Sequence, residues 1–296
     1  MNLKKDIIIT NKKRFDMMKE GIIKDGVEKL QVLADFDKTL TSCFVDGKKI
    51  VSLISILRDE HYLTPDYSEK AHALYNKYHP YEMDPNLSLE EKKKLMHEWW
   101  KTHYDLLIKS GLSKDDLKKV ANSQISFRSG ALEFFKILDK LNIPLIILSA
   151  AGLGAETISL YLERFNIHYK NIHVVSNEFI WGDDGKVAGV REPIIHNFNK
   201  DYTSVKKFTF YDEIKNRRNV ILLGDSISDT MMLNGYEYDK VMKIGFLSDD
   251  AEDESVQLLY EKAFDVLVLD DGPMDFVNEL LGSLVMGKLE KLEIRN

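Results

Sequence analysis

Cysteine is nearly absent from the chain, which has a single one, Cys43, among its 296 residues. One thiol excludes an intramolecular disulfide, as suits a reducing compartment. We expect Cys43 to pack as a small apolar side chain and not to act as a nucleophile. Long apolar runs are lacking too: the run Ile7–Ile9 lies between charged residues and is too short for the core of a signal peptide. Because no run approaches the roughly 20 residues of a membrane span, the chain is expected to be soluble and cytoplasmic.

The chain has fewer positively than negatively charged residues. The chain has 41 Lys and Arg residues against 48 Asp and Glu residues, which gives a net charge of −7. Such a chain lacks the basic face that a nucleic-acid backbone or an anionic membrane surface requires. We therefore expect no nucleic-acid polymer and no membrane as partners. Small anions are not excluded, because a few local cations and backbone amides suffice to hold them.

Short apolar runs rich in β-branched residues recur along the chain and predict buried strands. Continuous runs of this kind are typical of a parallel sheet that is covered on both faces. Helical patterns lie between several of them, at 131–141 and 156–165. This alternation predicts an α/β fold with a doubly wound, Rossmann-like parallel sheet. The predicted strands are 31–36, 143–148, 172–175, 219–223, 241–244 and 264–269.

One long segment interrupts the alternation, because its pattern is helical from 49 to 121. Ser88 with Glu91, and Ser113 with Asp116, have the spacing of N-terminal helix caps. The segment follows the first predicted strand of the sheet. Ligands of open α/β sheets bind beyond the carboxyl ends of the strands, so the insertion is expected to lie over such a site.

The predicted domains follow from this insertion. We expect a core made of residues 1–48 and 125–296 and a helical cap of residues 49–124. The cap is expected to close over bound substrate and to exclude water from the site. Its hinges are predicted at 45–49 and 123–128, where the insertion joins the core.

Two aspartates, Asp35 and Asp37, lie at the end of the first predicted strand. At a strand end, a turn brings the first side chain and the second backbone carbonyl onto one cation, and Mg²⁺ prefers such hard oxygen ligands. A carboxylate also attacks phosphorus, and a second acid protonates a leaving oxygen. An ordinary turn that closes a strand accounts for the same residues. The motif alone leaves both interpretations open.

Further polar residues follow other predicted strands. Ser149 and Ala150 open a small-residue loop, where a hydroxyl and free amides form a phosphate cradle. The alternative is a serine that only caps a helix. Asp225 and Asp229 follow a later strand, where Asp225 would complete a magnesium site; a turn with a helix cap is the alternative. Lys200 has no specificity by itself, because most lysines are solvated.

As an ordered set, these residues resemble the signature of the haloacid dehalogenase-like phosphohydrolases. That signature is Asp-x-Asp-x-Thr, then serine or threonine after a strand, then lysine, then Gly-Asp-x-x-x-Asp. Over nearly the whole chain, the sequence also resembles the cytosolic 5′-nucleotidase III family, the pyrimidine and 7-methylguanosine monophosphate nucleotidases. Lys38, where methionine is common, and the extra small residue at Ala151 depart from the family pattern. The segments that carry the resemblance are 35–41, 78–85, 98–100, 149–152, 174–177 and 196–200.

The resemblance implies a Mg²⁺-dependent phosphatase with a haloacid dehalogenase-like core. By this resemblance, Asp35 is the nucleophile, and Asp37 is the general acid and then the base for the water that hydrolyses the phosphoenzyme. Asp35, the carbonyl of Asp37 and Asp225 would hold Mg²⁺.

The same resemblance assigns the residues around the phosphate. Ser149, Ala150 and Lys200 would bind the phosphoryl group, and Asp229 would orient Lys200 or a metal-bound water. Phosphoryl transfer mainly requires positioning and charge neutralisation, and this set supplies both.

The cap is expected to choose the substrate. By the resemblance, Glu82 reads the edge of the base; an exposed loop carboxylate is the alternative. Trp99 and Trp100 are about 100° apart on a helix, so we expect Trp99 in the cap core and Trp100 stacked on the base. His61 and Tyr62 are candidates for the opposite face of the base. Packing within the cap is the alternative for all these aromatic residues.

The combined features predict a 5′-nucleotidase that hydrolyses pyrimidine nucleoside 5′-monophosphates, and after them 7-methylguanosine monophosphate, through an aspartyl phosphate. A phosphatase of a phosphoamino acid or sugar phosphate is the alternative among enzymes, because the core chemistry does not name the leaving group. Arg58 is the only arginine between 49 and 121, which disfavours a second anion. A non-catalytic nucleotide-binding protein would be expected to lack a chemical residue, and none is missing. We expect a monomer or a small homo-oligomer.

Overall fold

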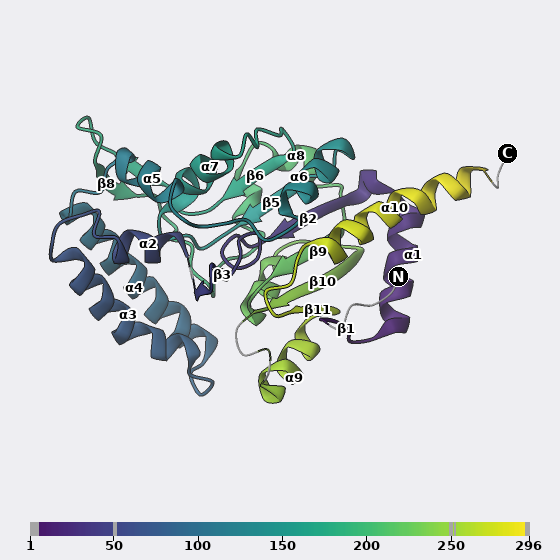
Figure 1. Ribbon diagram of the computed structural model, residues 1–296, viewed down its shortest axis with the longest axis horizontal. Helices are drawn as coiled ribbons and strands as arrows, with labels where there is room; N and C mark the ends of the chain where they lie inside the picture. Colours follow the sequence, from purple (N-terminus) through teal and green to yellow (C-terminus); the bar gives the residue numbers. More distant parts are fainter. Residues whose placement is uncertain (1–5, 50–51, 249–250, 252, 294–296) are drawn as a thin grey trace.

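A seven-stranded sheet forms the centre of the molecule, with the strand order β1-β11-β10-β9-β2-β5-β6 (Figure 1). The computed structural model describes residues 6–49, 52–248, 251 and 253–293. All neighbouring strands from β11 to β6 are parallel, and only β1 pairs antiparallel with β11. The prediction of a doubly wound parallel α/β core is thus confirmed.

Each parallel strand overlaps one of the predicted apolar runs. Their alternate side chains feed two hydrophobic clusters: Val32 and Ala34 join one, whereas Leu33 joins the other. Because both faces are buried, the runs are continuously apolar and do not alternate with polar residues. The parallel strands are β2 (Leu30–Ala34), β5 (Leu145–Leu148), β6 (Ile172–Val175), β9 (Asn219–Gly224), β10 (Lys240–Leu247) and β11 (Val266–Leu269).

The edge strand β1 (Ile7–Ile9) is not apparent in the sequence pattern. Three residues are too few to show a strand period. The segment becomes a strand only because β11 lies beside it, with Ile8 paired to Leu267. Tertiary pairing, and not local propensity, determines this element.

Helices cover both faces of the sheet. On one face, Phe15, Phe134, Ile158 and Val277 join the cluster that contains Val32. These residues come from α1 (Lys12–Asp25), α6 (Ala131–Lys140), α7 (Gly154–Arg164) and α10 (Asp275–Glu293). The opposite face carries α8 (Tyr211–Ile214), α9 (Glu254–Ala263) and the short turns η2 (Val205–Lys207) and η3 (Ile227–Leu233). The remaining core elements are η1 (Val27–Lys29) and the hairpin β7 (Phe179–Trp181) and β8 (Val187–Val190). None of the helices in the described residues combines the length and apolar character needed to cross a membrane.

The segment inserted after β2 is mostly helical. It opens with the short hairpin β3 (Phe44–Val45) and β4 (Lys48–Lys49) and continues as α2 (Leu53–Asp59), α3 (Tyr67–Met83), α4 (Leu89–Lys109) and α5 (Lys114–Ala121). We call α2 to α5 the helical cap.

Two features stabilise the helical cap: hydrogen bonds at the first residues of its helices and packing between helices. The predicted caps at Ser88 and Ser113 are confirmed, because each side chain accepts a bond from the amide of the third helical residue. Helices α3 and α4 lie side by side at one end of the sheet, and α5 packs on α7 of the core (Figure 1). The insertion leaves the core at the carboxyl end of β2, the side of the sheet where ligands are expected.

Candidate active site

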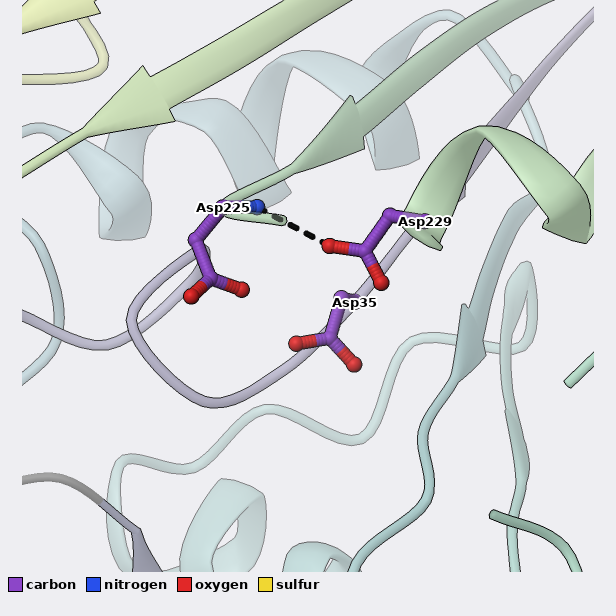
Figure 2. A group of neighbouring side chains, drawn as sticks. All are labelled: Asp35, Asp225 and Asp229. Atoms are coloured by element: carbon purple, nitrogen blue, oxygen red, sulfur yellow. Dashed lines mark hydrogen bonds between the residues drawn. The ribbon is translucent and has the colours of Figure 1, made fainter. Parts of the chain in front are cut away.

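The carboxyl ends of β2 and β9 bring two aspartates together. Ala34 pairs with Leu223 in the sheet, and the amide of Asp35 donates to the carbonyl of Leu223 at 3.0 Å. Asp35 and Asp225 therefore leave neighbouring strands at nearly the same level. Asp229 joins them from η3, and one oxygen from each of the three carboxylates lies within 4.8 Å of the others (Figure 2).

Asp229 is held by its own turn. One of its carboxylate oxygens accepts hydrogen bonds from the amides of Asp225 at 3.0 Å and Ser226 at 2.9 Å. Gly224 permits this approach, because a Cβ at that position would lie 2.5 Å from the Cβ of Asp229. Asp229 thus caps a helical turn, as the structural interpretation of the motif expected, while its second oxygen faces Lys200.

Lys200 lies between two of these carboxylates. The residue is 3% exposed, and Nζ lies 2.7 Å from Asp35 and 2.7 Å from Asp229. Burial opposes the charge of Lys200, but Asp229 and Asp35 outweigh it, so the pKa of the ammonium lies above its usual range. The buried lysine remains charged because two carboxylates surround it.

Burial and mutual repulsion disfavour the negative charge of the carboxyl groups in the cluster. Burial raises the pKa of Asp35 to about 8, and Asp229 and Asp225 add to this effect against the opposing charge of Lys200. Burial also raises the pKa of Asp37 to about 7 and raises the pKa of Asp225. A divalent cation would offset this charge through the hard oxygen ligands that it prefers. The chemistry of this donor set therefore fits a divalent-metal site.

Asp37 and Lys38 connect the cluster to the helical cap. The carboxylate of Asp37 accepts a bond from the amide of Leu53, the first residue of α2, at 3.4 Å. Lys38 has a left-handed backbone with φ of 56°, and its Nζ lies 3.3 Å from Asp225. Lys38 thus places a second cation beside the acid cluster. The family that the sequence resembles commonly has methionine at this position.

Ser149 and Ala150 follow β5, the strand next to β2. The amide of Ser149 donates to the carbonyl of Val175 at 3.0 Å, and the residue is 2% exposed. Asn177 supports this loop, because its Nδ2 donates to the carbonyl of Ala151 at 3.4 Å. The predicted phosphate cradle therefore lies at the same edge of the sheet as the acid cluster.

Glu82 and Trp100 approach the core from the helical cap. Glu82 is half-buried near the end of α3 and not in a loop, and its carboxylate accepts a bond from Nδ2 of Asn197. The ring of Trp100 faces the loop after β5, since a Cβ on Gly152 would lie 2.7 Å from it. Both cap residues therefore contact loops that flank the acid cluster.

The other predicted cap residues, Trp99 and His61, lie in different surroundings. Trp99 packs against Tyr78 of α3 with 5.9 Å between ring centroids, in line with a role in the cap core. Its ring is also nearly parallel to that of Trp100, at 6.0 Å and 14°, although their backbone positions diverge. His61 is exposed just past α2, and among the described residues no hydrogen bond, ion pair or ring contact joins it to Trp100 or to the acid cluster.

Two residues at the site are not marked by sequence pattern. Asn197 lies in the segment that resembles the family, but nothing in that segment indicates that its amide reaches Glu82. Arg128 appears only as the end of a predicted hinge, yet it is fully buried beneath the loop that follows Asp37. The sequence gives one signal only: an arginine without an acidic neighbour at the end of the segment that returns from the helical cap.

Comparisons with known proteins agree with this geometry. The family described as pyrimidine 5′-nucleotidase (UMPH-1) matches residues 38–285. A 7-methylguanosine phosphate-specific 5′-nucleotidase from Gallus gallus is 34% identical over 268 residues, which cover 90% of this chain and 91% of that protein. The crystal structure of cytosolic 5′-nucleotidase IIIB bound to cytidine has a TM-score of 0.86 and 29% identity, covering 98% of this chain and 96% of that one. A substrate-bound phosphoserine phosphatase, with a TM-score of 0.51 and 16% identity over 84% of this chain and 96% of that one, shares the fold alone.

The family match begins just after Asp37 and extends into α10. The curated relative is similar along nearly its entire length, so the likeness includes both the sheet and the helical cap. The resemblance inferred from the motifs is thereby confirmed. The chain belongs to the pyrimidine 5′-nucleotidase family and is a hydrolase of the 5′-nucleotidase type.

Proposed function

We propose that the chain hydrolyses nucleoside 5′-monophosphates with a pyrimidine or 7-methylguanine base, in a reaction that requires Mg²⁺. The observation that carries this proposal is the buried contact of 2.7 Å between Lys200 and Asp35. A cation beside a carboxylate nucleophile offsets the charge of an incoming phosphoryl group. The names of the relatives support the substrate class: one is specific for 7-methylguanosine phosphate, and the other binds cytidine.

The proposed reaction has two steps on Asp35. In the first, a carboxylate oxygen of Asp35 attacks phosphorus, the bond to the 5′ oxygen breaks, and Asp37 gives its proton to that oxygen, so the nucleoside leaves. In the second, Asp37 takes a proton from water, whose oxygen attacks phosphorus and breaks the bond to Asp35. Phosphate leaves, and both carboxyl groups return to their initial states.

The other core residues hold the phosphoryl group and the metal. Asp35, the carbonyl of Asp37 and Asp225 would hold Mg²⁺, which when bound neutralises phosphoryl oxygens in the transition state. Lys200 adds a point charge to these oxygens, and Ser149 and Ala150 donate hydrogen bonds to them. Asp229 keeps Lys200 in this orientation, in keeping with their distance of 2.7 Å.

The helical cap selects the base in this proposal. An ionised Glu82 accepts hydrogen bonds and donates none, so it suits the amine of cytosine or the N1–H and amine of 7-methylguanine. Adenine, like cytosine, offers one amine beside an acceptor nitrogen, so this contact favours 7-methylguanine, with its two donors, over adenine. Trp100 stacks on the base, most strongly on the positively charged 7-methylguanine. The cap, with proposed limits 49–124, closes over the nucleotide and excludes water.

A panel of phosphate-release assays tests the proposal. Cytidine, uridine and 7-methylguanosine 5′-monophosphates should be hydrolysed faster than adenosine 5′-monophosphate, phosphoserine or a sugar phosphate. Turnover should disappear after chelation, return with Mg²⁺ and return poorly with Ca²⁺, which takes more ligands at longer distances. Equal rates on all bases, a preference for phosphoserine, or full turnover after exhaustive chelation would contradict it.

Metal binding has a readout that does not depend on turnover. Mg²⁺ bound only by the folded chain raises the melting temperature by mass action. We expect Mg²⁺ to raise the melting temperature of the native chain and not that of Asp225→Asn. Asp25→Asn is the matched control, because Asp25 also pairs with a lysine, Lys240, but lies away from the cluster at the end of α1. An equal shift in Asp225→Asn would remove Asp225 from the metal site.

A further inference from the structure

Arg128 is the largest fully buried side chain in the described part of the chain, with 1% of its surface exposed. It lies just before α6, where the segment that returns from the helical cap enters the core. A buried guanidinium is unfavourable unless hydrogen bonds and an opposite charge compensate for its lost hydration. The partners of Arg128 therefore indicate what this position does.

The guanidinium group binds the loop that follows Asp37. Its Nε donates to the carbonyl of Thr39 at 2.8 Å, and Nη2 donates to the carbonyl of Lys38. Its Nη1 donates to the carbonyl of Gly272 at 2.8 Å. The three nitrogens of this planar group thus bind three carbonyls. Two of these carbonyls directly follow Asp37, and one lies in the loop after β11.

Asp271 completes this arrangement. Its carboxylate lies 3.0 Å from Nη1 of Arg128 and also accepts bonds from the amides of Cys43 at 2.9 Å and Phe44 at 3.1 Å. Cys43 and Phe44 belong to the segment that leaves the core for the helical cap. The ion pair therefore connects the outgoing linker with Arg128 on the returning linker.

The two linkers also pair directly. Thr41 and Phe127 form an antiparallel bridge, and the amide of Ser42 donates to the carbonyl of Ser126 at 2.9 Å. The amide of Arg128 donates to the carbonyl of Leu40 at 2.9 Å. The linkers are thus joined to each other next to the loop that follows Asp37.

We propose that Arg128 and Asp271 form a positioning pair that holds the peptide groups after Asp37 in place while the helical cap moves. The inference rests on the proposed role of Asp37 as general acid and as a carbonyl ligand. Both functions require that the backbone at Asp37 keeps its orientation, because misplacement by about 1 Å can slow a reaction about 10²-fold. The planar fork of arginine suits this task, since it reaches several carbonyls at fixed angles.

Arg128→Lys separates positioning from charge. Lysine keeps the positive charge beside Asp271, but a single ammonium cannot reach the carbonyls of Lys38, Thr39 and Gly272 in the same geometry. We expect kcat to fall about 10²-fold on both a nucleotide and a small generic phosphomonoester. The KM for the nucleotide should change by less than about threefold, because the residues that contact the base are untouched.

Arg217→Lys is the matched control. Arg217 donates to the carbonyls of Val27 and Leu30 at 3.0 Å each, so it binds backbone at the opposite end of β2. Both variants should melt at lower temperature than the native chain, whereas only Arg128→Lys should lose kcat per folded molecule. Unchanged kcat in Arg128→Lys, or an equal loss in Arg217→Lys, would overturn the positioning role.

Hydrogen exchange tests the same pair without catalysis. In Arg128→Lys and Asp271→Ala, the amides of Leu40, Cys43 and Phe44 should exchange faster, while amides of the helical cap keep their rates. Unchanged exchange at these three amides would contradict the proposal. If the native chain released no phosphate from any nucleotide, the proposed function would fail, and this exchange measurement would still decide whether the pair holds the loop.

Discussion

The acid cluster and the surface of the helical cap that we propose to contact the base differ in how firmly the fold holds them. Asp35, Lys200 and Asp229 are 7%, 3% and 2% exposed and bind one another. Glu82 is only half-buried and contacts the core through Asn197, and His61 is exposed. A strand end and a buried ion-pair network hold the first group in place, whereas the second depends on how a helical insertion lies on the core. Substitutions in the cluster should therefore affect every substrate, and those in the cap should affect the choice among substrates.

The largest effect is expected from Asp35→Asn. The amide is nearly isosteric but a very poor nucleophile, so turnover should fall by about four orders of magnitude or more on all substrates. Phosphate release from a nucleotide and from a generic phosphomonoester measures this loss. Asp25→Asn, at the end of α1, should keep native rates. Near-native turnover in a folded Asp35→Asn chain would remove Asp35 from the nucleophile role.

Lys200→Met should reduce both activity and stability. It removes the cation that Asp35 and Asp229 share, and breaking a buried ion pair costs about 3 kcal/mol or more of folding free energy. Loss of the point charge on the phosphoryl group should lower kcat by about 10²–10³-fold. Denaturant unfolding and single-substrate kinetics measure the two effects. Loss of stability with unchanged kcat per folded molecule would make Lys200 a structural residue only.

Glu82→Ala should change selectivity more than rate. Loss of a hydrogen bond to a charged group should reduce the preference for 7-methylguanosine over adenosine monophosphate by about tenfold or more. Hydrolysis of a generic phosphomonoester should continue at nearly the native rate. Glu90→Ala, at an exposed position in the first turn of α4, is the control and should leave selectivity unchanged. Equal losses on every substrate would assign Glu82 to cap folding.

The smallest effect is expected from Asn197→Ala, which breaks a contact between the two regions. Glu82 loses the amide that orients it, so the KM for nucleotides should rise by about threefold while kcat on a generic phosphomonoester stays constant. Asn86→Ala, an exposed position at the same end of the cap, should have no effect. If Asn197→Ala slowed all substrates alike, the distinction between the two regions would not hold at this contact.

The sequence predicts the parallel core and the acid cluster because both depend on local pattern. Asp35 and Asp225 follow apolar strands, and a parallel topology brings such strand ends together. Lys200 is different: no strand end marks it, and only the ordered signature singles it out before the structure shows its contacts with Asp35 and Asp229.

Features that depend on distant pairing could not be predicted from the sequence. Strand β1 exists because β11 lies beside it. Arg128 and Asp271 are far apart in the chain, and their hydrogen bonds are mostly to backbone groups, which no side-chain pattern reveals. The placement of His61 beside the base stays a prediction, because it depends on how α2 lies on the core and the sequence pattern does not contain that information.

The close approach of Trp100 to the core depends on the absence of a Cβ atom at Gly152. A Cβ on Gly152 would lie 2.7 Å from Trp100 and 3.2 Å from Ile54, so both cap side chains rest on a position without a side chain. An alanine there would act as a wedge between the helical cap and the core. The spacing between the helical cap and the loop after β5 is therefore set by Gly152, and adding a single methyl group there should hold the two apart.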